Sequence, residues 1–450
     1  MQTVTIPYGD TTIDVELPDR ARVIRRTAEP PPPLPDQERA IRDAIAHPIG
    51  IHPIPELVRP GARVLIAFDD PTSQTRGRIR AQAIEAVLDE LRRAGVREEN
   101  VTLVCANALH RKFTHEELAV VLGPELVARF GERLMCHDAE DRDNLITIGT
   151  TATGHLVEVN RLVVDCDLTV YVNSGVNLGF SGGWKSVCVG LSTWNSIKAT
   201  HHPDGMSMSV RNNRMHRVLD EMGALLEARL GRQIFKVEMI LSDPEHVAYV
   251  WAGSVAETRA RAMDVMAERN PPRRAAGEPV DVVLYGVPNQ SPYAVFSKVN
   301  PILTLISSGL GYQGGYIEAL GKAGCSVILA TPCTEQWDEE HHPSYPDVWR
   351  NVLSQTTDAY EIDRRFAQRY AEEPRYIERY RHAYGFHGVH AILATQPLKR
   401  LKHAGRVFVA GPDDPAVPRH VGFIPVPSVE AAIREAERVH GPDCAIACIV

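Results

Sequence analysis

A stretch near the middle of the 450-residue chain carries glycine, lysine and histidine at spacings suited to holding an anionic cofactor. An apolar, β-branched run at 162–172 predicts a buried strand before it, and residues 180–185 read FSGGWK. Glycines in such a turn let backbone N–H groups approach a ligand closely. A single helix is predicted to open at Lys185 and to end near His201 and His202, with its N-terminus facing a phosphate.

Two other interpretations of this stretch stay open from the residues alone. Residues 179–186 nearly match the nucleotide P-loop, G-x-x-x-x-G-K-[ST], but Trp184 stands where that motif needs its second glycine. An indole at this position would obstruct the wrap of the backbone around a β-phosphate. The stretch is alternatively a structural glycine turn, since such turns are common.

Polar side chains that follow predicted strands form a second candidate group. The run RVLIAF at 63–68 is typical of a buried strand, and Asp70, Thr72 and Arg76 come after it. A further predicted strand delivers His110 on the loop that follows it. Because ligands bind beyond the carboxyl ends of strands in α/β sheets, these side chains are expected at a ligand crevice. His110 is suited to act as a general base, whereas Arg76 is either an anion ligand or a solvated arginine.

Two stretches of the sequence together resemble the nickel-dependent lactate racemase family. The first is FSGGWK at 180–185, followed by His201. The second is ALHRKFTHEE at 108–117, which is similar to the family segment G-x-H-R-x-x-[ST]-x-E-E. Their order and spacing agree with the family, and the similarity runs weakly along most of the chain. The resemblance implies a divergent racemase or epimerase of a 2-hydroxy acid or a related secondary alcohol.

The resemblance also implies a cofactor. In that family a lysine is joined, as a thioamide, to pyridinium-3,5-bisthiocarboxylic acid mononucleotide, which carries nickel in a sulfur/carbon pincer. Lys185 matches the tether and His201 the nickel ligand, and soft sulfur with imidazole in a planar set suits nickel(II). Cofactor-biosynthesis proteins are therefore expected partners. The residues assigned to the cofactor on this basis are Lys185, Ser181, Gly182, Gly183, Asp70, Thr72 and Arg76.

The family mechanism removes hydrogen as hydride from a carbinol carbon while a histidine takes the hydroxyl proton. His110 matches one of the two family bases, but the second would lie ten residues before the lysine, where this chain has Gly175. His341 and His342, among carboxylates in the segment 335–345, are the candidates to replace it. Without a replacement, a one-sided redox reaction or a cofactor-binding homologue without turnover would remain.

The substrate is predicted only by class. Lys298 is the counterpart of a family lysine that meets the substrate carboxylate, whereas Val295 replaces a family glutamine three residues earlier. The resemblance thus implies a small hydroxy acid or a sugar-acid-like molecule, and leaves its identity open.

The composition of 44% hydrophobic and 24% charged residues is that of an ordinary globular enzyme. A net charge of −8 without a basic run argues against nucleic-acid binding. No apolar run approaches the roughly 20 residues of a membrane helix, and the first residues do not read as a signal peptide. Eight cysteines, scattered singly, favour a reducing compartment. We expect a cytoplasmic protein.

The length and the alternation of strand and helix patterns predict an α/β protein with two α/β domains and a cofactor and substrate cleft between them. Residues 1–270 are expected to bind the cofactor, and residues 278–424 to close over the substrate. The segment 270–277, NPPRRAAG, is the predicted linker. A C-terminal helix within 425–450 is a candidate to pack back on the first domain.

Overall fold

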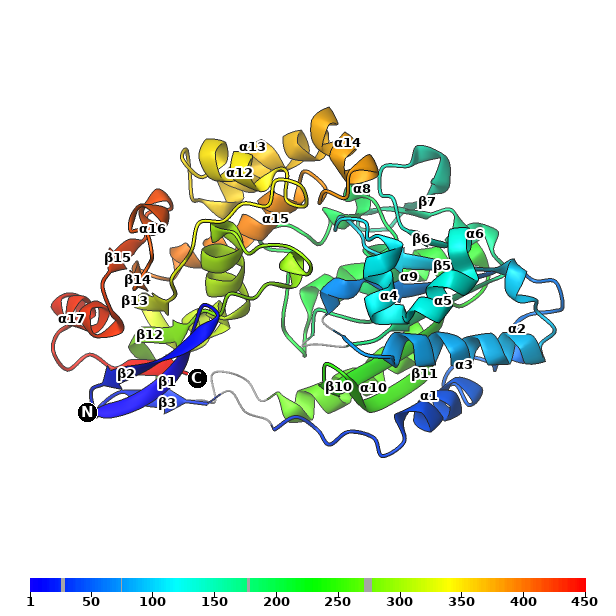
Figure 1. Cartoon of the computed structure of the whole chain (residues 1–450), viewed down its shortest axis with the longest axis horizontal. Coiled ribbons are helices and arrows are strands. Elements are labelled where there is room, and N and C mark those ends of the chain that lie inside the picture. The colour runs from blue at the N-terminus through cyan, green and yellow to red at the C-terminus, as the bar shows by residue number, and fades with distance from the viewer. Residues whose placement is uncertain (26–28, 74, 176–178, 271–276) are drawn as a thin grey trace. The chain divides into compact units, whose positions relative to one another are not determined.

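The computed structural model describes residues 1–25, 29–73, 75–175, 179–270 and 277–450, and the chain divides into two compact units (Figure 1). Unit 1 comprises Met1–Ala28, Pro271–Arg379 and Gly385–Val450. Unit 2 comprises Glu29–Asn270 and a short return of the chain at Tyr380–Tyr384.

Unit 2 is built on a six-stranded sheet in the order β11-β10-β9-β4-β5-β6. Neighbouring strands are parallel, except that the edge strand β11 runs antiparallel to β10. Because β4 lies between β5 and β9, the order of the strands reverses there, and the carboxyl ends of these strands flank a topological switch point. The strands are β4 (Val64–Asp69), β5 (Val101–Ala106), β6 (Leu134–Cys136), β9 (Leu168–Asn173), β10 (Phe235–Asp243) and β11 (His246–Ser254).

The central strands of unit 2 are apolar on both faces because both faces are covered. All six residues of β4 are buried, as are all six of β9, which is the pattern that a covered parallel sheet requires. A small antiparallel pair, β7 (Leu145–Thr150) and β8 (Leu156–Asn160), lies outside this sheet. The longer helices of the unit are α1 (Gln37–Ala46), α3 (Ile79–Arg93), α4 (His115–Leu122), α5 (Pro124–Phe130), α9 (Arg214–Leu230) and α10 (Val255–Arg269).

Unit 1 contains a second six-stranded sheet, which is parallel throughout, in the order β15-β14-β13-β12-β16-β3. The hairpin of β1 (Gln2–Tyr8) and β2 (Thr11–Leu17), blue in Figure 1, packs beside β12. The sheet strands are β3 (Arg22–Ile24), β12 (Val280–Gly286), β13 (Gly321–Ala330), β14 (Arg406–Ala410), β15 (Ile424–Val426) and β16 (Ile446–Ile449).

The helices of unit 1 follow its strands and include two π-helices, Val348–Val352 and the longer Ile302–Tyr312. The longer segment is almost wholly buried, and π-helical turns occur frequently at functional sites. The other principal helices are α12 (Tyr345–Asp347), α13 (Ala359–Ala371), α14 (Pro374–His382), α15 (His390–Thr395), α16 (Ala416–His420) and α17 (Val429–His440).

The division of the chain differs from the predicted boundaries at both ends. Residues 1–28 were expected in the cofactor domain, yet β3 pairs with β16 in the sheet of unit 1. The helix expected to pack back on that domain, α17, packs against β13 and β14. Pairing between strands more than 400 residues apart leaves no local pattern, which is why the sequence did not indicate it. Most of the predicted linker 270–277 lies outside the described residues.

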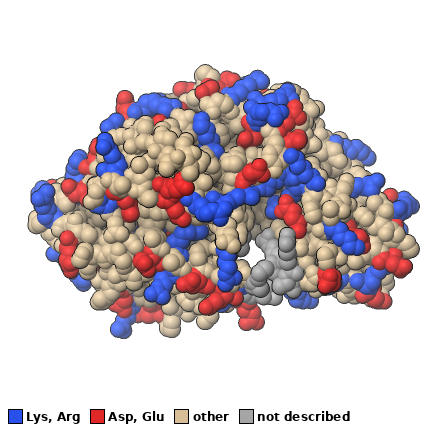
Figure 2. Space-filling view, turned by 180° about the vertical axis from the view of Figure 1, so that it is seen from behind, with Lys and Arg blue, Asp and Glu red and all other residues tan. Residues whose placement is uncertain are grey.

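The surface of the described chain is of mixed charge. Figure 2 shows basic and acidic side chains interspersed over the face that it draws. Among the helices that the structure describes, none is both long enough and apolar enough to cross a membrane.

Candidate active site

The loop after β4 is fixed by a buried arginine. Arg80, in the first turn of α3, is 1% exposed and donates to the backbone carbonyls of Asp69, Asp70 and Thr75, at 2.9, 3.0 and 2.8 Å. A buried guanidinium that bonds three carbonyls holds the loop in one conformation. Arg80 was not predicted from the sequence, although its place between Ile79 and Ala81 at the start of a helix was a usable signal.

This loop presents Asp70 to His110. The Nδ1 atom of His110 lies 2.7 Å from Oδ2 of Asp70, and the Thr72 hydroxyl donates to Oδ1 of the same carboxylate. Burial by itself would raise the pKa of Asp70, but the charge and hydrogen bond of His110 and the hydroxyl of Thr72 outweigh it, so the pKa is lowered. An anionic carboxylate at Nδ1 fixes the tautomer and orientation of the ring, as a general base requires.

The glycine turn before Lys185 is held from α10. Gly182 and Gly183 have φ angles of +79° and +54°, and a Cβ added at residue 183 would lie 2.4 Å from Cδ of Arg259. Residue 183 is therefore glycine for both backbone and steric reasons. The guanidinium of Arg259 donates to the carbonyls of Ser181 and Gly179, each at 2.9 Å.

A buried ion pair on β10 also supports this glycine turn. Oε1 of Glu238 accepts the backbone N–H of Gly183 and lies 3.8 Å from Nζ of Lys236. Lys236 also donates to the Ser186 hydroxyl and lies 4.3 Å from the centroid of the Tyr171 ring. Burial lowers the pKa of Lys236 to about 8, against the charge of Glu238. This pair was not predicted from the sequence, although the alternate charges in the strand FKVEMIL were a usable signal.

Lys185 itself occupies a partly buried position. Its Nζ atom lies 4.5 Å from the centroid of the Phe180 ring. Burial lowers the pKa of the Lys185 amine to about 8, and the charge of Asp70 partly offsets this. A larger fraction of the Lys185 amine is therefore uncharged than at an ordinary lysine, and the uncharged amine is the nucleophilic form.

His201 is held as a neutral imidazole. Its Nδ1 lies 2.9 Å from the Thr200 hydroxyl. Burial lowers the pKa of His201 to about 3, and the positive charges of Lys185 and of two histidines, His110 and His202, add to that effect. A neutral imidazole is the form that ligates a metal.

Unit 2 therefore brings five of the predicted residues into one electrostatic group. The charge of Asp70 acts on Lys185, while Lys185 and His110 act on His201. The buried amide oxygens of Asn107 and Asn173, at the carboxyl ends of β5 and β9, have no hydrogen-bond partner among the described residues. The five residues are Asp70, Thr72, His110, Lys185 and His201.

Arg76 stands apart from this group. Its side chain is exposed, and its backbone N–H donates to the carbonyl of Pro244 at 2.7 Å. This placement corresponds to the solvated arginine that the sequence left open as the alternative to an anion ligand.

The long helix predicted after Lys185 is wrong. The chain forms two four-residue helices instead, α7 (Lys185–Cys188) and α8 (Trp194–Ile197). Gly190 separates them, packed so closely that a Cβ there would lie 2.3 Å from the carbonyl of Ser186. So short a helix lacks the aligned dipoles that bind a phosphate at a helix N-terminus, which also weakens the P-loop interpretation. The strand predicted at 162–172 begins as a helical turn, α6 (Leu162–Asp165), before β9.

In unit 1, the two candidate replacement bases differ in their surroundings. His341 is partly buried, and its Nδ1 lies 3.0 Å from Oδ2 of Asp338. His342 is fully buried, with Nε2 2.8 Å from the carbonyl of Tyr293 and Nδ1 3.3 Å from the Ser297 hydroxyl. Structural groups therefore face both ring nitrogens of His342, which favours His341 as the base.

The substrate-binding candidate and the carboxylate of this second pair are also in unit 1. Lys298 is exposed. Burial would raise the pKa of Asp338, but the backbone N–H and ring of His341 and the Ser297 hydroxyl lower it strongly. Asp338 thus remains a carboxylate beside the imidazole.

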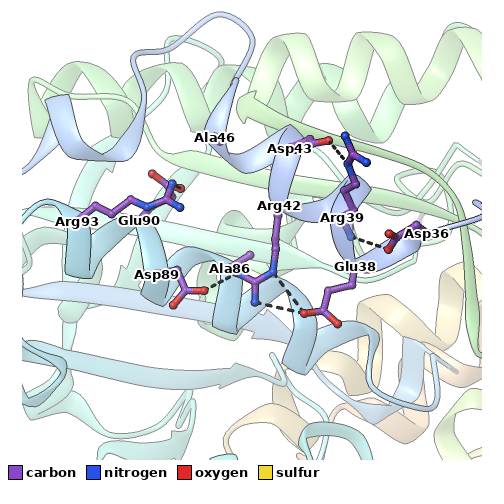
Figure 3. Close-up of a pocket in the computed structure, with 10 residues that line it drawn as sticks. All are labelled: Asp36, Glu38, Arg39, Arg42, Asp43, Ala46, Ala86, Asp89, Glu90 and Arg93. Atoms are coloured by element: carbon purple, nitrogen blue, oxygen red, sulfur yellow. Dashed lines mark hydrogen bonds and ion pairs between the residues drawn. The ribbon is translucent and has the colours of Figure 1, made fainter.

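A hollow between α1 and α3 of unit 2 is a different kind of feature. Figure 3 shows that charged side chains line it. Arg42 pairs with Asp89 and Glu38, and Arg93 pairs with Glu90 at 2.6 Å. None of the candidate site residues lines this hollow, whose lining contains five acidic and three basic side chains.

Comparisons with known proteins relate the chain to lactate racemases. A family model described as the lactate racemase N-terminal domain matches residues 8–214. The chain is 25% identical over 377 residues to the lactate racemase of Thermoanaerobacterium thermosaccharolyticum, covering 80% of this chain and 82% of that one. It is 24% identical over 267 residues to the lactate racemase of Lactiplantibacillus plantarum, covering 57% and 60% of the two chains.

Solved structures share the fold. The lactate racemase apoprotein from T. thermosaccharolyticum matches with a TM-score of 0.72 and 20% identity, over 100% of this chain and 98% of that one. A structural-genomics crystal structure from Thermotoga maritima matches with a TM-score of 0.55 and 13% identity, over 92% and 96%. At these identities the likeness establishes the α/β fold.

Proposed function

Because the chain is a divergent member of the lactate racemase family, we propose that it is an isomerase, a racemase or epimerase of a 2-hydroxy acid or a related secondary alcohol. The observation that carries this proposal is the grouping of Lys185, His201, His110 and Asp70 in unit 2. A lysine for a tether, an imidazole for a metal and a carboxylate-bound base are the side chains that such a reaction needs.

The residues present fit a covalently held nickel-pincer nucleotide. Lys185 offers an amine whose charge is disfavoured by burial, and His201 offers a neutral imidazole. At the same sheet edge, the buried amide oxygens of Asn107 and Asn173, which accept no hydrogen bond from the residues that the structure describes, are suited to polar groups of a ligand. When bound, the pyridinium group and its nickel supply an acceptor for the hydrogen on the carbinol carbon.

The chain's own part in the reaction is the movement of a proton. His110 takes the proton of the substrate hydroxyl, and Asp70 stabilises the resulting imidazolium through the 2.7 Å contact at Nδ1. Loss of that proton, together with departure of the carbinol hydrogen as hydride, would convert the alcohol to a ketone, and the planar carbon would then have two faces for the return of the hydrogen. Return to the opposite face inverts the centre.

We assign the second base to His341, positioned by Asp338. The family's position for that base is Gly175, and a Cβ there would lie 3.2 Å from Oγ1 of Thr75 and 3.4 Å from Cδ1 of Leu241. A histidine at residue 175 would therefore require its neighbours to move. Lys298, whose ammonium is exposed, is assigned to the substrate carboxylate.

The proposal is tested with protein coexpressed with the cofactor-biosynthesis proteins and given single enantiomers of lactate and larger 2-hydroxy acids, deuterated at C2. We expect inversion with deuterium retained at C2, because the hydrogen returns to the carbon from which it came. Washout of deuterium into water would contradict hydride chemistry. Accumulation of the ketone without inversion would identify a one-sided redox enzyme, and absence of any turnover by loaded protein would identify a cofactor-binding homologue.

A further inference from the structure

We propose that Tyr380, from the far C-terminal part of the chain, is a positioning residue for His110. This inference rests on the proposed role of His110 as a base. It concerns the five-residue return Tyr380–Tyr384, which belongs to unit 2 although it lies more than a hundred residues beyond the rest of that unit.

The turn that carries His110 has an unfavourable backbone conformation. Ala108 has a φ of +50°, which costs free energy for a residue with a Cβ and persists only where surrounding contacts hold it. Its N–H donates to the carbonyl of Gly190 at 3.0 Å. The side-chain amide of Asn107 donates to the carbonyl of His110 at 3.0 Å, and the N–H of His110 donates to the carbonyl of Asn107 at 2.7 Å.

Tyr380 also contacts this turn. Its hydroxyl donates to the carbonyl of Ala108 at 3.0 Å, across 272 residues of sequence, and accepts the N–H of Ala139 at 2.9 Å. The side chain is fully buried. One hydroxyl therefore joins the loop after β5, which bears His110, to the loop after β6.

A second set of contacts holds the return in place. Nζ of Lys112 donates to the carbonyl of Arg381 at 2.9 Å and to Oδ2 of Asp138 at 2.7 Å. Nε of Arg381 lies 3.3 Å from the same oxygen of Asp138. Lys112 is two residues beyond His110, and Ala108 is two residues before it. The loop that bears His110 therefore contacts the return on both sides of the histidine.

Removal of the hydroxyl has a defined consequence. The Ala108 carbonyl and the Ala139 N–H would be left buried without a partner, which is more costly than the loss of a solvent-exposed hydrogen bond. Fewer contacts then stabilise the strained turn in its conformation. As a result, the 2.7 Å contact between His110 and Asp70 is no longer held in one geometry. We expect substrate binding and cofactor loading to be unchanged, because the Tyr380 hydroxyl is bonded to backbone atoms of Ala108 and Ala139 and the tether and metal-ligand candidates, Lys185 and His201, lie on another segment.

The test compares Tyr380→Phe with Tyr376→Phe in the cofactor-loaded full-length protein. Tyr376 lies one turn earlier on α14, is 4% exposed and donates its hydroxyl to Oδ2 of Asp347 at 2.7 Å. Both variants lose one buried hydroxyl from the same helix, but only Tyr380 contacts the His110 turn. We expect about a tenfold fall in kcat for Tyr380→Phe with KM and nickel content unchanged, and less than about a twofold change for Tyr376→Phe.

A spectroscopic readout separates positioning from general destabilisation. In histidine-labelled protein the Nδ1 proton of His110, hydrogen-bonded to Asp70, should change its chemical shift in Tyr380→Phe and not in Tyr376→Phe. If Tyr380→Phe does not fold, Lys112→Met removes the contacts to Arg381 and Asp138 at the loop surface and should lower kcat by a smaller factor with the same change of the His110 resonance.

The outcomes distinguish this inference from the proposed function. Wild-type kcat and an unchanged His110 resonance in Tyr380→Phe, with His110→Ala inactive, would overturn the inference and leave the proposed function standing. Wild-type kcat in His110→Ala would overturn the inference together with the assignment of His110 as a base, whereas absence of turnover by the loaded wild-type protein would overturn the proposed function.

Discussion

In each unit we assign the role of base to one imidazole held by a carboxylate, and the two pairs are built in opposite ways. In unit 2 His110 lies 2.7 Å from Asp70, 40 residues away in sequence, and in unit 1 His341 lies 3.0 Å from Asp338, three residues away. A hydroxyl donates to the carboxylate in both, from Thr72 in one and Ser297 in the other. The imidazoles are similarly covered, with 23% and 20% of the side chain exposed.

The difference lies in what each pair depends on. Asp70 and His110 meet because β4 and β5 are neighbours, and their loops are fixed by Arg80 and Tyr380, so this pair exists only in the folded unit. Asp338 and His341 meet through a local turn of the chain, in which Oδ1 of Asp338 also accepts the N–H of His341. Under the proposed function, a short local motif of this kind would replace the family base absent at Gly175 more readily than a second pair of sheet loops would.

The largest expected effects come from removal of the imidazoles. His110→Ala and His341→Ala should each lower racemisation by a factor of about 10² to 10⁴, the usual contribution of a general base. In single turnovers, ketone formation should fail from one enantiomer in His110→Ala and from the other in His341→Ala. Failure of both variants with the same enantiomer, or a wild-type rate for His341→Ala, would contradict the assignment of one base to each pair.

Removal of charge from the carboxylates should have smaller, unequal effects. Asp70→Asn is expected to lower kcat by about 10² and Asp338→Asn by about 10, because Asp70 is the more deeply buried carboxylate and its charge is screened less by water. Steady-state kcat with nickel content as the control measures this. Equal losses would indicate that burial of the carboxylate does not set its contribution.

A stability comparison tests the separation of His341 from His342. His342→Ala should destabilise the protein by about 2 to 4 kcal/mol, since the change opens a cavity and leaves the Tyr293 carbonyl without its ring partner. His341→Ala should cost less than about 1 kcal/mol at its partly exposed position. Urea unfolding of both variants gives the two values, and a reversed order would move the catalytic assignment to His342.

The smallest effect is expected from Arg76→Ala. Because the Arg76 side chain is exposed, kcat/KM and nickel content should change by less than about twofold. A loss above tenfold in either would restore Arg76 as an anion ligand.

The sequence predicted those parts of the site that follow directly from local patterns. The apolar run at 63–68 and the strand before His110 correspond to β4 and β5, so Asp70 and His110 were placed correctly at strand ends. FSGGWK indicated a turn with Lys185, and two of its residues, Gly182 and Gly183, do have positive φ.

What the sequence did not predict depends on contacts between distant segments. Glu238 and Arg259 hold the glycine turn from β10 and α10, and Tyr380 reaches the His110 loop from α14, yet each looks like an ordinary strand or helix residue. The helix predicted after Lys185 failed for the same reason, because close packing at Gly190 overrides a locally favourable helical pattern.

The most direct test of the central claim is the mass of the Lys185 peptide from protein coexpressed with the cofactor-biosynthesis proteins. We expect that peptide to gain the mass of a thioamide-linked pyridinium nucleotide. Lys185→Ala and Lys185→Arg should lose the adduct and most of the nickel, because a guanidinium cannot form the bond. His201→Ala should keep the adduct and hold nickel weakly. An active preparation whose Lys185 peptide has the unmodified mass would contradict the account.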